Sequence, residues 1–193
     1  MKRIVSVIAL FLCLAMMLGG CNANQDPNAP DGYKCVSAEE ADYFLYVPSD
    51  WIEGIGNLST SAYFSRGADA TSISVTAFGA KLAGETVDTW WESYKEEFSA
   101  EFDSFEVVST EDAQLGGIDG KKFTFTATKG TAEAETNAEG ETTGEKVAKQ
   151  YNFVCVAVVR EAYVYYLLYT STPQYYEAHL DTLSNVVSYF KFK

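Results

Sequence analysis

The fold is decided by two adjoining stretches, YNFVCVAVVR from Tyr151 to Arg160 and YVYYLLYT from Tyr163 to Thr170. Both are apolar at nearly every position and rich in β-branched and aromatic residues, which is typical of strands. Only Glu161 and Ala162 separate them, and so short a link favours antiparallel pairing. A strand that is apolar on both faces must be covered on both, so we expect this pair at the centre of a sheet.

Further strand patterns lie upstream of this pair. KFTFTAT alternates Phe123, Phe125 and Ala127 with threonines, and Asp119-Gly120 just before it is a hairpin signal. The predicted strands are Tyr33–Val36, Tyr43–Val47, Ala62–Phe64, Thr71–Phe78, Phe105–Leu115 and Lys122–Thr128.

Two segments have the three-to-four-residue apolar period of an amphipathic helix. One follows Thr86, a suitable N-cap, with apolar positions Val87, Trp91, Tyr94, Phe98 and Phe102. The other begins at Thr172-Pro173, with apolar positions Tyr176, Leu180, Leu183, Val187 and Phe190. Each helix can cover one sheet face. We therefore predict an α+β fold, a three-layer α/β/α sandwich with a mostly antiparallel central sheet of about seven to eight strands and one helix on each face.

The N-terminus has the pattern of a secretory signal peptide. Lys2 and Arg3 precede an uncharged, mostly aliphatic run from Ile4 to Leu18, which is shorter than the ~20 residues that a membrane-spanning helix needs. The run ends in Leu18-Gly19-Gly20-Cys21, which resembles the lipobox of bacterial lipoproteins.

This resemblance implies that residues 1–20 are removed after Gly20 and that lipid, including palmitate, is attached to Cys21. The protein would then be anchored in the cell membrane on its extracytoplasmic face. Two alternatives stay open, an ordinary signal peptide with a chance cysteine or an uncleaved anchor helix.

Residues 21–32 contain two prolines and no apolar periodicity, and we expect them to be a flexible tether. The domain then spans residues 33–193. Within it residues 129–149 (KGTAEAETNAEGETTGEKVAK) form an acidic segment without aromatics, which predicts a mobile hairpin extension or a disordered loop.

The order of elements between residues 33 and 193 resembles the PsbP/Mog1-like family. The resemblance rests on Tyr43-x-Leu45-x-Val47-Pro48-x-x-Trp51, the Thr-capped helix, the hairpin Gly117-x-x-Gly120 before Phe-x-Phe, and a last strand running through Thr172-Pro173 into a helix. That family includes photosystem II accessory subunits, a binder of a small GTPase and envelope lipoproteins. The resemblance implies a binding or accessory role and no enzymatic activity.

The net charge of −13 is an argument against nucleic acid as a partner, because phosphates require Lys and Arg. We expect no catalytic residues, no cofactor and no metal site. His179 is the only histidine and has no ligand motif near it, and we expect a half-exposed surface residue. Cys35 and Cys155 lie in apolar strands, where a disulfide and two buried free thiols remain alternatives.

Trp90 directly precedes Trp91 of the helical stripe and is expected at its edge or exposed, where it could form part of a partner surface. The function expected from these observations is a non-catalytic, membrane-anchored binding or accessory protein, whose partner could be another envelope protein. The alternative is a small-ligand or glycan-binding lipoprotein with an aromatic-lined groove. An enzyme with dispersed carboxylates is the third hypothesis.

Overall fold

The computed structural model describes residues 29–53, 60–65, 67, 69, 71–79, 84–132 and 146–193. The predictions for the signal peptide, for Gly20 and Cys21 and for most of the tether lie outside the described residues. Among the residues that are described, no helix is both long and apolar enough to cross a membrane.

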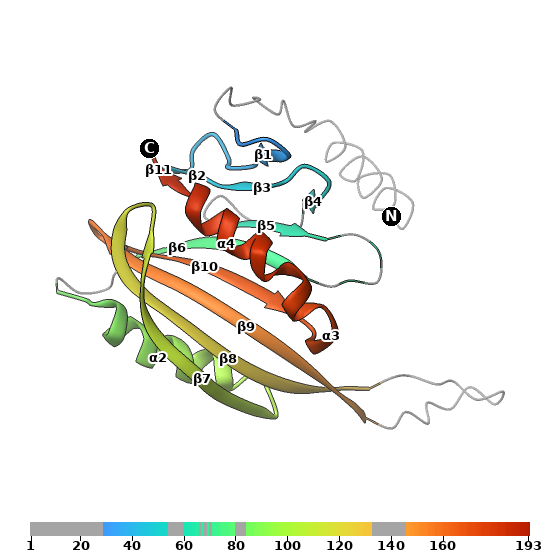
Figure 1. Cartoon of the computed structure of the whole chain (residues 1–193). Coiled ribbons are helices and arrows are strands. Elements are labelled where there is room, and N and C mark those ends of the chain that lie inside the picture. The colour runs from blue at the N-terminus through green and yellow to red at the C-terminus, as the bar shows by residue number, and fades with distance from the viewer. Residues whose placement is uncertain are drawn as a thin grey trace, which may run out of the picture.

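The centre of the protein is a seven-stranded sheet in which every neighbouring pair is antiparallel (Figure 1). Its order is β4-β5-β6-β10-β9-β8-β7. The strands are β4 (Ile52–Glu53), β5 (Thr60–Phe64), β6 (Ser72–Gly79), β7 (Ser104–Leu115), β8 (Ile118–Ala132), β9 (Lys146–Arg160) and β10 (Tyr163–Ser171). The two stretches that decide the fold are β9 and β10, and both lie inside the sheet as predicted. The α+β class with a large antiparallel sheet is confirmed.

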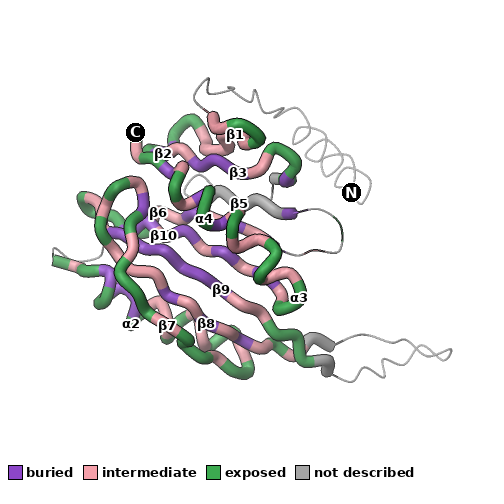
Figure 2. Tube along the Cα trace, in the orientation of Figure 1, coloured by how far each residue is buried: buried purple, intermediate pink, exposed green. Residues whose placement is uncertain are grey.

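Side chains that alternate along β9 divide the core between the two faces of the sheet. Phe153, Cys155 and Ala157 belong to a cluster that includes residues of the helix α2 (Val87–Ser99). Val154, Val156 and Val158 belong to a second cluster that includes residues of the helix α4 (Leu180–Tyr189). Figure 2 shows this burial as a continuous stretch in the middle of β9, beside alternating buried and intermediate residues along β10. The alternation of a strand therefore directs one set of side chains to each helix.

Helix α2 begins as the sequence predicts and ends earlier. The Thr86 side chain accepts a hydrogen bond from the Thr89 backbone N–H, and Thr89 reaches back to the Thr86 N–H, which forms a capping box. The helix ends at Ser99, so Phe102 packs on the same cluster from the following turn. Trp91 stacks on Phe123, with ring centroids 4.0 Å apart.

The single helix predicted after Thr172 is divided into three parts. A short helix α3 (Pro173–Tyr176) leads into a 3₁₀ turn η1 (Glu177–His179), and α4 follows. From α4 and its C-cap, Leu183, Val186 and Phe190 are buried against the sheet. Val186 takes the fully buried position that periodicity assigned to Val187, and Val187 packs on the same cluster partly buried.

Two small sheets lie beside α4, and they use segments from both ends of the domain (Figure 1). β1 (Tyr33–Cys35) pairs with β3 (Tyr46–Pro48), and β11 (Lys191–Phe192) pairs with β2 (Tyr43–Phe44). The predicted strand over residues 43–47 is thus two strands interrupted at Leu45, whose N–H donates to Ser37 Oγ at 2.6 Å.

Both ends of the acidic segment at residues 129–149 belong to strands. β8 continues to Ala132 and β9 begins at Lys146, so eight of these residues extend the central hairpin. Residues 133–145 lie outside the described part.

Candidate functional site

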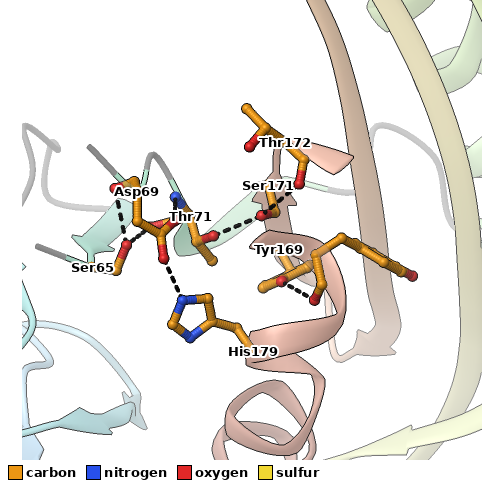
Figure 3. A network of polar contacts seen from close by, with 8 residues as sticks. Ser65, Asp69, Thr71, Tyr169, Ser171, Thr172 and His179 are labelled. Atoms are coloured by element: carbon orange, nitrogen blue, oxygen red, sulfur yellow. Dashed lines mark hydrogen bonds and ion pairs between the residues drawn. The ribbon is translucent and has the colours of Figure 1, made fainter. Parts of the chain in front are cut away.

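Polar side chains gather where one end of the sheet meets the turn between α3 and α4 (Figure 3). We call this group the corner network: it consists of Ser65, Asp69, Thr71, Tyr169, Ser171, Thr172, Tyr176 and His179. Its members come from the ends of β5 and β10, from the approach to β6, and from α3 and η1. The corner network includes His179 and an aspartate beside it, so it is the place to ask what chemistry the fold supports.

The contact between His179 and Asp69 joins residues 110 positions apart. His179 Nε2 lies 2.5 Å from Asp69 Oδ2, and the two side chains are 21% and 14% exposed. The indole ring of Trp51 meets the imidazole edge to face, with ring centroids 5.8 Å apart. The imidazole is therefore held between a carboxylate and an aromatic ring, and it connects η1 to the segment between β5 and β6.

Asp69 also organises its own turn. Its other carboxylate oxygen, Oδ1, accepts the Thr71 N–H at 2.8 Å, which is the hydrogen bond of an Asx turn. Ser65 Oγ donates to the Asp69 carbonyl at 3.0 Å, and the Ser65 N–H donates to the Thr71 carbonyl at 3.0 Å. These bonds close the segment from residue 65 to residue 71 and direct the carboxylate toward His179.

The remaining members of the network lie deeper. Thr71 Oγ1 and Ser171 Oγ are 2.7 Å apart and both residues are fully buried. The Ser171 hydroxyl is also 3.2 Å from the Thr172 carbonyl, and the Tyr169 hydroxyl donates to the Tyr176 carbonyl at 2.8 Å. Each hydroxyl therefore bridges two elements, as buried polar groups require.

The protonation of the network follows from these contacts. Burial raises the pKa of Asp69, but the hydrogen bonds from Thr71 and the contact with His179 outweigh it, so the pKa lies below its ordinary 3.8. Burial raises the pKa of Tyr169 to about 12. At neutral pH Asp69 is therefore a carboxylate and Tyr169 a neutral phenol that donates.

The chemistry available to the corner network is limited by how its groups are used. Nucleophilic catalysis needs a hydroxyl or thiol within hydrogen-bonding reach of the base. Among the described residues, the hydrogen-bonding partner of His179 is Asp69, and the hydroxyls of Ser65, Thr71 and Ser171 bond to carbonyls or to one another. In the same part of the chain no three His, Cys, Asp or Glu residues are placed to hold a metal ion. The arrangement is suited to holding elements together.

Cys35 and Cys155, the two cysteines in the described part of the chain, are free thiols in the structure, which does not contain the disulfide that the sequence left as an alternative. Cys155 belongs to the cluster beneath α2, whereas Cys35 lies in β1, whose neighbours Tyr33 and Val36 pack on the cluster beneath α4. The central sheet separates the two sulfur atoms. Burial raises the pKa of the Cys155 thiol, which therefore stays protonated.

The expectation that Trp90 is exposed is also wrong. Its side chain is 3% exposed, and its ring lies 4.7 Å from that of Tyr94 and 5.1 Å from that of Tyr166. Adjacent positions on a helix can both be buried when the sheet beneath is concave or wide, and here Trp90 and Trp91 both contact sheet residues. Trp90 is a core residue.

His179 is more enclosed than the predicted half-exposed surface residue, and its partner Asp69 was not among the residues expected from the sequence. A local signal for Asp69 exists, because Asp-x-Thr before a strand is the sequence of an Asx turn. Nothing in the sequence indicates that this turn meets His179.

The geometry described above defines an α+β protein with the Mog1/PsbP-like fold. Mog1p, a Ran-binding protein of Saccharomyces cerevisiae, is 14% identical and aligns over 83% of this chain and 95% of its own length, with a TM-score of 0.56. Cyanobacterial PsbP from Synechocystis is 10% identical over 92% of this chain and 99% of its own, with a TM-score of 0.51. A protein of unknown function from Pseudomonas aeruginosa is 13% identical over 79% and 92%, with a TM-score of 0.50. No family model and no curated protein sequence matches this chain.

Proposed function

We propose that the protein is a lipid-anchored, extracytoplasmic lipoprotein with a non-catalytic binding or accessory role, and that its partner is another protein of the cell envelope. Residues 1–20 are its signal peptide, Cys21 carries the lipid after cleavage at Gly20, and residues 21–32 are the tether. Residues 33–193 form a three-layer α/β/α domain.

The observation that carries the non-catalytic role is the internal use of the corner network. Its imidazole, carboxylate and hydroxyls are engaged with one another or with backbone carbonyls. A catalytic group must keep a free position for substrate. A binding role is further supported by the Mog1p likeness, since that protein of the same fold is described as Ran-binding.

The anchor rests on Leu18-Gly19-Gly20-Cys21 and is tested by mass spectrometry of the mature protein isolated from membranes. We expect an N-terminal Cys21 with the added mass of a diacylglycerol, with or without an amide-linked acyl chain. Cys21→Ala should release the protein from the membrane or leave it unprocessed. Cys35→Ala is the matched control and should leave anchoring unchanged. An intact Met1 at the N-terminus would contradict the proposal.

The binding role is tested by crosslinking the native protein in intact cells and identifying the captured partner. We expect an envelope protein that is captured by wild type and lost from the released Cys21→Ala form. The alternative of a small-ligand or glycan-binding groove lined by aromatic residues cannot use Trp90, because its ring is buried between α2 and the sheet.

A further inference from the structure

Strand β7 is a long strand at the border of the central sheet. The sheet ends at β7 on one side and at the two-residue strand β4 on the other. β7 has twelve residues, and β8 is its strand neighbour in the described part of the chain. The backbone groups that point away from β8 thus form an open edge, which is a template for another strand.

The turn between β7 and β8 determines which backbone groups face outward. Gly116 and Gly117 have φ of 60° and 80°, and two positive φ values define a type I′ hairpin closed by Leu115 and Ile118. The closing pair of such a turn is hydrogen-bonded, and bonded and non-bonded pairs then alternate along the ladder. The register is continuous back to Ser109, so the N–H and C=O groups of Gln114, Asp112 and Thr110 point outward.

Charged side chains and β-bulges usually keep other strands from pairing with a sheet edge, but along this part of β7 neither lies in a position to do so. Charged side chains guard edges, but here they bond across to β8: Asp112 Oδ1 lies 2.7 Å from Lys121 Nζ, and Glu111 Oε2 lies 2.9 Å from Lys122 Nζ. The β-bulge lies further back, between Val107 and Ser109, and Val108 there is 61% exposed. Residues 109–115 remain as a regular edge of seven residues that ends at the bulge.

We infer that this edge docks an extended segment of a protein partner in which Lys or Arg alternates with apolar residues, so that the segment adds a strand to the sheet. The inference rests on the proposed binding role and says where and what the protein binds. Main-chain hydrogen bonds to Thr110, Asp112 and Gln114 provide the attachment. The charge of the segment follows from complementarity with the chain as a whole, whose net charge is −13. Within β7, Glu111 and Asp112 are paired with lysines of β8, and Glu106 is the remaining charged residue. A second copy of the chain is disfavoured, since two chains that each have a net charge of −13 repel each other.

The test uses the full-length protein in neutral detergent and a fluorescent peptide, Lys-Val-Lys-Val-Lys-Val-Lys, with Glu-Val-Glu-Val-Glu-Val-Glu as its matched control. We expect anisotropy to show saturable binding of the first peptide and at least tenfold weaker binding of the second. Amide exchange at Thr110 and Asp112 should slow on binding. Equal binding of both peptides, or unchanged exchange at these amides, overturns the inference.

Thr110→Pro and Thr110→Val separate the edge from general electrostatic attraction. Proline removes the outward N–H and projects a ring toward the added strand without taking a bond from the β7–β8 ladder. We expect at least tenfold weaker binding of the basic peptide to Thr110→Pro and wild-type binding to Thr110→Val, with both variants folded by circular dichroism. Equal affinity of the two variants, or a β7-mediated dimer in sedimentation, contradicts the inference. An unlipidated Cys21 would overturn the anchor without affecting this binding assay.

Discussion

At the scale of single residues, the His179 imidazole is held by a carboxylate from a distant turn and by the ring of Trp51. The Thr86 cap and the burial of Trp91 follow from their immediate neighbours. The contact between His179 and Asp69 joins positions 110 residues apart, and no local pattern shows that they meet. The same limit explains Trp90, because its burial depends on Tyr166 from a distant strand.

Replacing Asp69 should destabilise the protein in two separable steps. Asp69→Asn keeps an oxygen for the Thr71 N–H and loses the charge beside His179, whereas Asp69→Ala loses both. We expect Asp69→Ala to lower the free energy of unfolding by about 1–3 kcal/mol and Asp69→Asn to lower it by less. Urea unfolding at pH 7 measures both variants. Equal stability of Asp69→Ala and wild type would show that the corner network is dispensable.

The pH dependence of stability should change in the same variants. Because the folded pKa of Asp69 lies below 3.8, its contribution is fully present above the unfolded pKa and is lost as pH falls through the folded pKa. Wild type should therefore lose stability relative to Asp69→Asn as the pH falls below about 4. Parallel profiles of unfolding free energy against pH would contradict the lowered pKa.

The two thiols should differ in reactivity. Cys155 is fully buried with a raised pKa and Cys35 is partly exposed. In native protein, iodoacetamide should modify Cys35 at least tenfold faster than Cys155, since only an accessible thiolate reacts. In 6 M guanidinium the rates should converge. A Cys35–Cys155 crosslinked peptide in a non-reducing digest would refute the free-thiol assignment.

At the scale of elements, the strands with clear alternation or continuous apolar character were predictable. β6 to β10 appear where the sequence places them, with ends shifted by a few residues. The two-residue strands β4 and β11 were not, because their pairing is determined by tertiary neighbours. The break at residues 177–179 was missed for a related reason. A helical period of apolar residues continues through a single 3₁₀ turn with only a small phase error.

Substituting two glycines of the β7–β8 hairpin tests two different costs of adding a side chain, backbone strain at Gly117 and a steric clash at Gly120. Gly117 has φ of 80° and open space where a side-chain methyl would lie, whereas a Cβ on Gly120 would lie 2.0 Å from the Ala157 carbonyl oxygen. We expect Gly117→Ala to cost about 1–2 kcal/mol through its left-handed backbone. Gly120→Ala should cost more, because β8 and β9 must separate there. Chemical denaturation of both variants tests the order, and the reverse order would refute this account of the hairpin.

At the scale of the whole molecule, charge and topology act together. The chain has a net charge of −13 and a pI of about 4.4. Among the described residues, the three shortest pairs of a lysine with a carboxylate have exposed carboxylates and are of modest energetic value. Stability therefore comes mainly from the two apolar clusters on opposite faces of the sheet. The sequence predicted the two apolar helical stripes, because each has the three-to-four-residue period of an amphipathic helix.

Salt should stabilise the protein at neutral pH. Self-repulsion of a strongly acidic chain weakens the compact state, and raising the salt concentration shortens the screening length from about 30 Å at 0.01 M to about 10 Å at 0.1 M. We expect the Tm at pH 7.5 to rise by a few degrees over this range. Near pH 4.4 the effect should vanish because the net charge approaches zero. A Tm that does not rise at pH 7.5 would contradict dominance of this repulsion.

The pairing of β11 with β2 also bears on the order in which the protein is made. Phe190 stacks on Tyr43 at 5.4 Å, and the Lys193 N–H donates to the Asp42 carbonyl at 2.8 Å. The cluster beneath α4 therefore joins residues from opposite ends of the domain and cannot close until residue 190 has left the ribosome. Nearly the whole domain must therefore be translated before this cluster can form. For a chain exported as proposed, this delay favours threading through a translocon as an open polypeptide, with folding on the far side.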